Sequence, residues 1–241
     1  MKKLLLLALL LAGQVRAQFL INPYVFGGNV PTNNLQLYWD ASVPASYPGT
    51  GTTFFDLSGN GRNGTMVNGV TYNAGSGGYM NFDGTNDYIA NTSYSVKGLS
   101  NCTVHVWKKH AGSTSGTSFN SGGTSNEAVR LEFNYYYFFA AAGFHGINTD
   151  SGTNSDSWKL FTFTYESGQQ KIYENGVLQA ATLNISGALN NPSGTRTTLG
   201  ADVTYANFSA VDVGSVAIYS STFVAGEVLQ FFNATKTRFG Y

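Results

Sequence analysis

The stretch Asp56–Ile89 (DLSGNGRNGTMVNGVTYNAGSGGYMNFDGTNDYI) carries the patterns that decide the fold of this chain. Residues 56–61 (DLSGNG) place two glycines and an asparagine among short polar side chains, which is typical of a turn with positive φ angles and side-chain hydrogen bonds to the backbone. We interpret these residues as a hairpin corner. Residues 79–83 then alternate apolar and polar side chains, residues 84–86 form a turn, and residues 87–89 resume a strand.

Short strands and polar turns continue on both sides of this stretch. Asn175-Gly176 is the strongest short hairpin signal in the sequence. Residues 111–125 are almost wholly Gly, Ser and Thr, which predicts a long loop of the kind that carries binding function. Alternating or continuous apolar residues predict further strands at 35–40, 102–109, 129–133, 135–142, 158–165, 170–174, 196–200 and 211–219.

One helix is predicted near the C-terminus. Val224, Val228 and Phe232 recur at i, i+4 and i+8 with Leu229 beside them, and a Ser-Thr pair at 221–222 can cap the first turn. We expect this helix to pack on the edge of a β-sandwich.

The composition fits a single all-β domain. Of the 241 residues, 42% are hydrophobic and 11% are charged, and the 29 glycines suit many turns. Cys102 is the single cysteine, so no disulfide can form within the chain, and its place in an apolar strand predicts a buried side chain.

Residues 1–17 have the pattern of a secretory signal peptide, with two lysines, an apolar run and small residues before Ala17. Its removal would leave ten basic against thirteen acidic residues, a net charge of −3, so there is no basic field for nucleic acid and no further apolar run for a membrane span. We therefore predict an extracellular, secreted protein. Residues 18–34 are expected to form an extended lead-in arm before a domain at 35–241.

Taken together, these patterns resemble the laminin-G-like branch of the concanavalin A-like lectin/glucanase superfamily. The resemblance implies a two-sheet antiparallel jelly roll of about twelve to fourteen strands. The segments that carry it follow the family order, and they are LQLYWD (35–40), DLSGNGRNGT (56–65), FDGTNDY (82–88), TVHVW (103–107), WKLFTFTYESGQQKIYENG (158–176) and VAIYSSTFVAGEVLQFFNATKTRFG (216–240).

The closing segment and the NPYVFGG lead-in at 22–28 are also similar to virion surface proteins of tailed bacteriophages. That likeness implies an alternative, in which the protein decorates a phage particle, has capsid or tail proteins as partners and binds no sugar. It conflicts with residues 1–17, because a virion protein made in the host cytoplasm does not ordinarily need a secretory signal.

Catalysis is not predicted. Some members of the superfamily hydrolyse glucans with a Glu-x-Asp-x-x-Glu array, and nothing in this sequence matches it. The nearest acidic pair is Glu127 and Glu132, whose odd spacing would direct them to opposite faces of one strand. The three histidines are scattered, and there is no G-x-S-x-G motif. A glycoside hydrolase is therefore the least favoured function.

The resemblance permits calcium, although no cofactor is required. Asp56 and Asp83, with Asn60 and Asp87, offer hard oxygen ligands of the kind that calcium takes. The same side chains in Gly-rich corners commonly hydrogen-bond their own turn, and we favour that role.

The favoured function is non-catalytic recognition or adhesion, with carbohydrate or host-surface glycans as the partner. Sugar binding uses aromatic platforms surrounded by polar side chains. Tyr135 and Tyr137 would share one strand face, with Asn134 beside them, and we name these three as the ligand-binding candidates. A core aromatic stripe explains the same residues.

Overall fold

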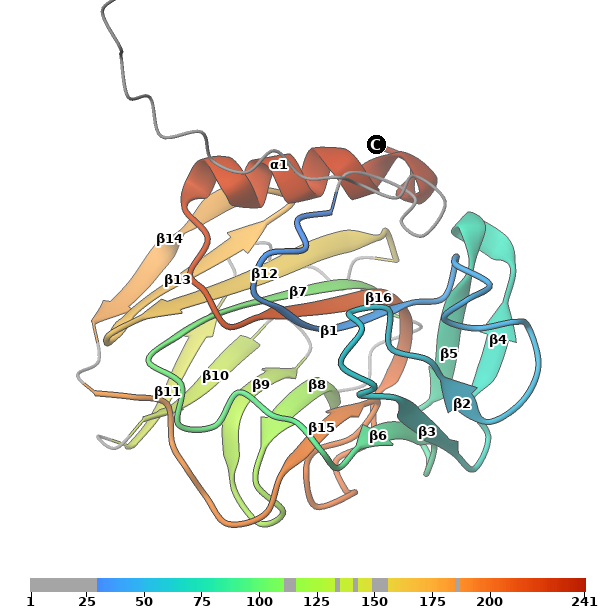
Figure 1. Ribbon diagram of the computed structural model, residues 1–241, viewed down its shortest axis with the longest axis horizontal. Helices are drawn as coiled ribbons and strands as arrows, with labels where there is room; N and C mark the ends of the chain where they lie inside the picture. Colours follow the sequence, from blue (N-terminus) through green and yellow to red (C-terminus); the bar gives the residue numbers. More distant parts are fainter. Residues whose placement is uncertain (1–29, 111–115, 133–134, 141–142, 149–155, 185–186) are drawn as a thin grey trace, which may run out of the picture.

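The computed structural model describes residues 30–110, 116–132, 135–140, 143–148, 156–184 and 187–241, with the backbone alone at 135–140, 143–148 and 180–184. Two antiparallel sheets lie face to face, and the C-terminal helix lies across the outer face of one of them (Figure 1). The predicted all-β sandwich with one short helix is confirmed. The described residues form sixteen strands, more than expected, because several are only two to four residues long.

The first sheet lies between the helix and the second sheet. Its hairpin of β12 and β13, paired from Phe161–Glu174 to Glu166–Gln169, confirms the predicted 158–176 hairpin. Its order is β14 (Val177–Asn184), β13 (Gln169–Glu174), β12 (Lys159–Glu166), β7 (Asn101–His110), β16 (Ala210–Tyr219), β5 (Tyr79–Asp83) and β4 (Thr71–Asn73), and β1 (Leu35–Asp40) also pairs with β16.

The second sheet contains the opening stretch and the candidate ligand-binding strand. Its order is β11 (Gly143–Asn148), β10 (Tyr135–Ala140), β9 (Glu127–Glu132), β8 (Thr117–Gly122), β15 (Arg196–Leu199), β6 (Tyr88–Asn91), β3 (Gly64–Val67) and β2 (Thr53–Phe54). Because β2 and β3 pair across residues 55–63, the predicted hairpin corner is confirmed. In contrast, β5 and β6 belong to different sheets, so residues 84–87 carry the chain from one sheet to the other.

The structure corrects the predicted loop at 111–125. Residues 111–115 lie outside the described residues, but Thr117–Gly122 form β8, which pairs with β9 and β15 in the interior of the second sheet. Its Ser, Thr and Asn side chains show no apolar alternation. Backbone pairing on both edges stabilises this strand, and composition does not reveal such pairing.

Two hydrophobic clusters hold the layers together. One lies between the sheets and includes the free Cys102, which is buried as predicted. The other lies between the first sheet and α1 (Ala225–Thr235), with Trp107 and Tyr219 of the sheet against Phe231 and Phe232 of the helix. The helix thus packs on a sheet face and not on the sandwich edge.

The start of the helix also differs from the prediction. Val224 occupies the N-cap position, and its N–H donates to Glu227 Oε2 at 2.9 Å, whereas Thr222 Oγ1 donates to Tyr165 O. Val224 and Leu229 are exposed, and Val228 is buried as predicted. The remaining helices are single turns of 3₁₀ type, η1 (Gly75–Gly77) and η2 (Lys236–Phe239). In the described part of the chain, no helix has the length and apolar character needed to cross a bilayer.

Candidate functional site

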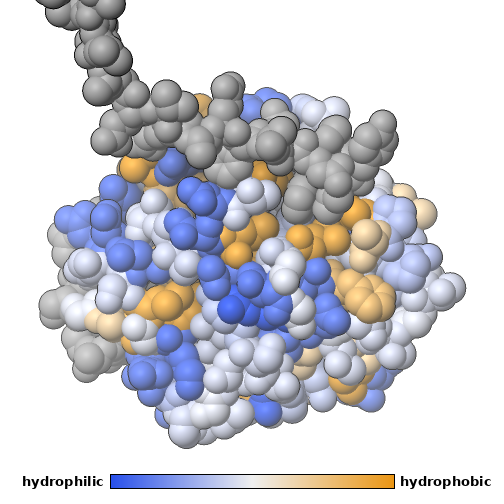
Figure 2. Space-filling view, viewed as in Figure 1, coloured by the Kyte–Doolittle hydropathy of each residue, from blue (hydrophilic) through white to orange (hydrophobic). Residues whose placement is uncertain are grey.

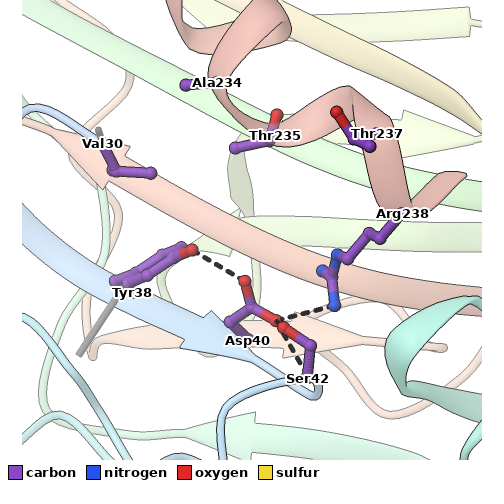
Figure 3. Close-up of a pocket in the computed structure, with 8 residues that line it drawn as sticks. All are labelled: Val30, Tyr38, Asp40, Ser42, Ala234, Thr235, Thr237 and Arg238. Atoms are coloured by element: carbon purple, nitrogen blue, oxygen red, sulfur yellow. Dashed lines mark hydrogen bonds and ion pairs between the residues drawn. The ribbon is translucent and has the colours of Figure 1, made fainter. Parts of the chain in front are cut away.

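A small pocket lies between β1 and the C-terminal segment (Figure 3). Its volume is about 80 Å³, and its centre is the buried carboxylate of Asp40. Tyr38 Oη donates to Asp40 Oδ2 at 2.7 Å, and Ser42 Oγ donates to Oδ1 at 2.7 Å. Arg238 Nη1 lies 3.0 Å from the same Oδ1.

These contacts give the pocket a structural role. Both oxygens of Asp40 are bonded to groups of the chain, and the ion pair with Arg238 attaches the end of the chain to β1. Ligand pockets usually enclose about 300–1,000 Å³, several times the volume here. The pocket is therefore too small for a typical ligand. Figure 2 shows hydrophilic and hydrophobic groups interspersed on one side of the molecule.

Asp56, a predicted metal candidate, organises the turn at 55–63. Its Oδ1 accepts hydrogen bonds from the N–H groups of Tyr38 and Ser58, both at 2.9 Å. Its Oδ2 accepts from Arg62 N at 2.9 Å and from Ser58 Oγ at 2.7 Å. Asn60 donates through Nδ2 to the carbonyl oxygens of Leu35 and Gln36. Both carboxylate oxygens of Asp56 thus accept hydrogen bonds from the chain, which is the turn role that the sequence favours.

Asp83 lies in a separate turn, between β5 and β6. It accepts from Thr85 N at 2.7 Å, and this bond holds the pKa of the exposed Asp83 carboxyl below its usual range. Asp87 accepts from Asp83 N at 3.0 Å, and burial raises the pKa of Asp87. Among the residues with described side chains, no three His, Cys, Asp or Glu form a cluster that could hold a metal. Calcium at Asp56 and Asp83 stays a prediction.

We expect Asp56→Asn to lower the free energy of unfolding by about 2–3 kcal/mol, because an amide cannot accept from donors on both of its polar atoms. Chemical denaturation with and without calcium checks this, and Asp156→Asn, at an exposed aspartate, is the matched control. A loss that appears only when calcium is present would show that Asp56 is a metal ligand after all.

A polar cluster lies on the outer face of the second sheet. Arg130 bonds to two carboxylates, through Nη1 to Glu127 Oε1 at 3.0 Å and through Nε to Glu132 Oε1 at 3.2 Å. Asn120 of β8 donates to Glu127 Oε1 at 2.7 Å, and its own Oδ1 is buried with no partner among the described residues. Burial raises the pKa of Glu127, and Arg130 opposes that shift.

The two glutamates lie on the same face, contrary to the sequence prediction. The pairing of β8 with β9 shifts between Ser121–Val129 and Gly122–Glu127, so Ala128 is an extra residue in β9. Such a bulge reverses the alternation of side chains along the strand. The odd spacing of Glu127 and Glu132 therefore places both beside Arg130.

The loop 200–209 between β15 and β16 joins this cluster to an aromatic pair. Asn207 Nδ2 donates to Glu132 Oε1 at 2.7 Å, and the ring of Tyr205 stacks on Tyr88 with centroids 4.4 Å apart. The guanidinium of Arg196 lies 3.9 Å from the Tyr205 ring centroid, and its Nη1 donates to Val203 O. We call this region the polar face, and its residues are Tyr88, Asn120, Glu127, Arg130, Glu132, Arg196, Tyr205 and Asn207, of which Asn120 and Glu127 are buried.

Backbone strain is concentrated in the same loop. Tyr205 and Asn207 have φ angles of 61° and 49°. Asparagine tolerates this left-handed region, but a bulky aromatic residue rarely adopts it, and such strain persists where the surrounding structure enforces it. The fold therefore holds the Tyr205 ring in place at a conformational cost.

Two of the three predicted ligand-binding residues are in the strand next to the polar face. Asn134 is outside the described residues. Tyr135 and Tyr137 are in β10, and the backbone register pairs Tyr137 with Arg130. The sequence does not indicate Asn120, Arg196 and Tyr205 as site residues, because they come from two strands and a loop that only the tertiary structure brings together. The isolated tyrosine in the polar segment 200–209 was the one available signal.

Comparisons with known proteins agree with the observed architecture. The family model described as "Concanavalin A-like lectin/glucanases superfamily" matches residues 83–229. No curated protein matches the sequence. Domain 4 of AbnA, an extracellular arabinanase from Geobacillus stearothermophilus solved in complex with arabinotriose, is 15% identical, with a TM-score of 0.63 over 82% of this chain and 98% of that domain.

Two further solved structures share the fold. The binding domain of botulinum neurotoxin serotype D is 15% identical, with a TM-score of 0.62 over 84% of this chain and 52% of that one. Trypanosoma rangeli sialidase is 14% identical, with a TM-score of 0.62 over 87% of this chain and 34% of the enzyme. This chain thus spans about half of the toxin domain, and likeness at these identities concerns the fold alone.

Proposed function

Because the chain belongs to the concanavalin A-like lectin/glucanases superfamily, we propose that it is a non-catalytic recognition module that binds carbohydrate through the polar face. The observation that carries the proposal is the partly exposed stack of Tyr88 and Tyr205, in which Tyr205 is held at a positive φ. Aromatic faces with amides and carboxylates around them suit the apolar faces and hydroxyl groups of sugars. The arabinanase domain bound to arabinotriose supports carbohydrate as the ligand class.

The contacts of the two glutamates favour binding over hydrolysis. Glycoside hydrolases need one carboxyl group to protonate the leaving group and another to attack or to activate water. Here Arg130 bonds to both Glu127 and Glu132, and Asn120 and Asn207 each donate to one of them. Sustained release of reducing sugar from a polysaccharide, abolished by Glu132→Gln, would contradict a non-catalytic role.

Tyr205→Asn is expected to weaken glycan binding by about tenfold or more, as the loss of a central aromatic contact does. Asparagine tolerates the left-handed backbone at this position, so the fold should be kept. Binding on a glycan array and thermal melting check both expectations. Tyr241→Ala, which removes an exposed tyrosine beside Phe232 on the helix side of the molecule, is the matched control.

We extend the proposal to the setting of the protein. Residues 1–17 support secretion, and Tyr135 and Tyr137 of β10 would extend the binding surface next to Arg130. Virion-surface attachment through capsid or tail proteins is the alternative, which the 22–28 segment supports. N-terminal sequencing of exported protein separates the two: a start at Gln18 supports secretion, and incorporation into particles without cleavage supports the alternative.

A further inference from the structure

We propose that the polar face selects uncharged glycans and excludes sialylated or sulfated ones. This inference rests on the proposed carbohydrate-binding function and specifies its ligand class. It follows from how the charged side chains of the face are already paired.

Both arginines of the polar face have partners within the chain, and the Nε of Arg196 is buried without a hydrogen-bond partner among the described residues. Arg130 bonds to the carboxylates of Glu127 and Glu132, at 3.0 and 3.2 Å. Arg196 lies over the Tyr205 ring and donates to Val203 O. An anionic sugar at Arg130 would compete with the carboxylates of Glu127 and Glu132, because sulfate and carboxylate groups are best held by an arginine with donors to spare.

The charge of the polar face also disfavours an anionic ligand. Glu127, Glu132 and the neighbouring Asp202 outnumber Arg130 and Arg196, and Asp202 lies near enough to Glu127 to raise its pKa. An approaching anion meets this acidic excess at short range, and like charges brought together weaken binding.

The other polar and aromatic side chains at the polar face carry no charge. Thr204 and Asn207 are exposed in the loop, and the partly exposed rings of Tyr88 and Tyr205 offer apolar surface. Hydroxyl, amide and aromatic groups together match a polyhydroxylated ligand without a formal charge.

The test uses an array of neutral oligosaccharides of glucose, galactose, mannose and arabinose, each with a sulfated counterpart, together with lactose and sialyllactose. In each pair of which at least one member binds, we expect the neutral oligosaccharide to bind about tenfold more tightly than its charged counterpart. This binding should depend little on salt concentration. In Glu132→Gln, one negative charge and its ion pair with Arg130 are lost, so the preference should shrink. Glu166→Gln, at an exposed residue in the β12–β13 turn, should leave the preference unchanged.

The outcomes separate the two proposals. If the wild type prefers sulfated or sialylated glycans, or if Glu132→Gln leaves the preference intact, the ligand class is wrong and carbohydrate binding stands. If no glycan on the array binds, both proposals fail. Thermal melting of each variant confirms that a change in preference is not a loss of folding.

Discussion

Trp107→Ala should lower the free energy of unfolding by about 3–5 kcal/mol, the usual cost of removing a large aromatic side chain from a core. Trp107 has no exposed surface, and it stacks on Phe239 with ring centroids 4.1 Å apart and on Phe232 at 5.8 Å. Its Nε1 also donates to Thr235 Oγ1 at 2.8 Å. The substitution leaves a cavity between β7 and α1, and it leaves the C-terminal segment without its main contact on the sheet.

Denaturant titration measures this loss, and thermal melting should show a decrease of roughly 10 °C for a chain of this size. Leu229→Ala is the matched control, because Leu229 lies on the same helix with 45% of its surface exposed. Its effect should stay within about 0.5 kcal/mol. A loss in Trp107→Ala as small as that expected for Leu229→Ala would mean that the packing of α1 on the sheet contributes little to stability.

Acid should destabilise the protein through His105. This histidine is buried between β7 and α1, where its ring stacks on Phe231 at 3.7 Å and its Nδ1 lies 2.8 Å from Thr162 Oγ1. Its Nε2 has no hydrogen-bond partner among the described residues. Burial lowers the pKa of His105 from 6.5 to about 3, because the charged imidazolium would lose its hydration.

The direction of this pH effect follows from proton binding at His105 in the unfolded and the folded chain. Below about pH 6.5 the unfolded chain binds a proton at His105, whereas the folded chain does not until about pH 3. The free energy of unfolding therefore falls as the pH decreases through this window, by on the order of 5 kcal/mol in total. The facing Tyr219 stays neutral throughout, because burial raises its pKa well above the ordinary value.

His105→Phe isolates this contribution. Phenylalanine keeps the stack on Phe231 and cannot be protonated, so the variant should lose less stability between pH 6.5 and pH 3. Carboxylates titrate in the same window in both proteins, and their effect cancels in the difference. Identical stability profiles for the wild type and the variant would show that His105 is not the acid-sensitive group.

Much of the architecture could be predicted from local patterns. The 158–176 hairpin, the turn at 55–63 and the burial of Cys102 are all confirmed, because alternation, Asn-Gly turns and apolar strand composition act over a few residues. The strand pairings beyond these hairpins could not be predicted. β5 and β6 are neighbours in the chain but lie in different sheets, and the polar β8 pairs with the distant β15 as well as with its neighbour β9.

The candidate site, like the fold, could be predicted from the sequence only in part. The sequence indicated recognition through aromatic and amide side chains and placed the ligand in the region around β10. The sequence could not predict that Glu127 and Glu132 share one face, because this depends on a bulge in β9. It also could not predict that Tyr205 stacks on Tyr88.

The sequence by itself thus determined the fold class, the hairpins at 55–63 and 158–176 and the absence of an internal disulfide, since each follows from residue types over short distances. The tertiary structure alone decided the role of Asp56–Ile89. Its first turn is held by the Asp56 carboxylate, which accepts a hydrogen bond from Tyr38 N of β1, and its second turn passes between the sheets and places Tyr88 in the polar face. These contacts join residues that are distant in the chain, and only the packing of the two sheets brings such residues together.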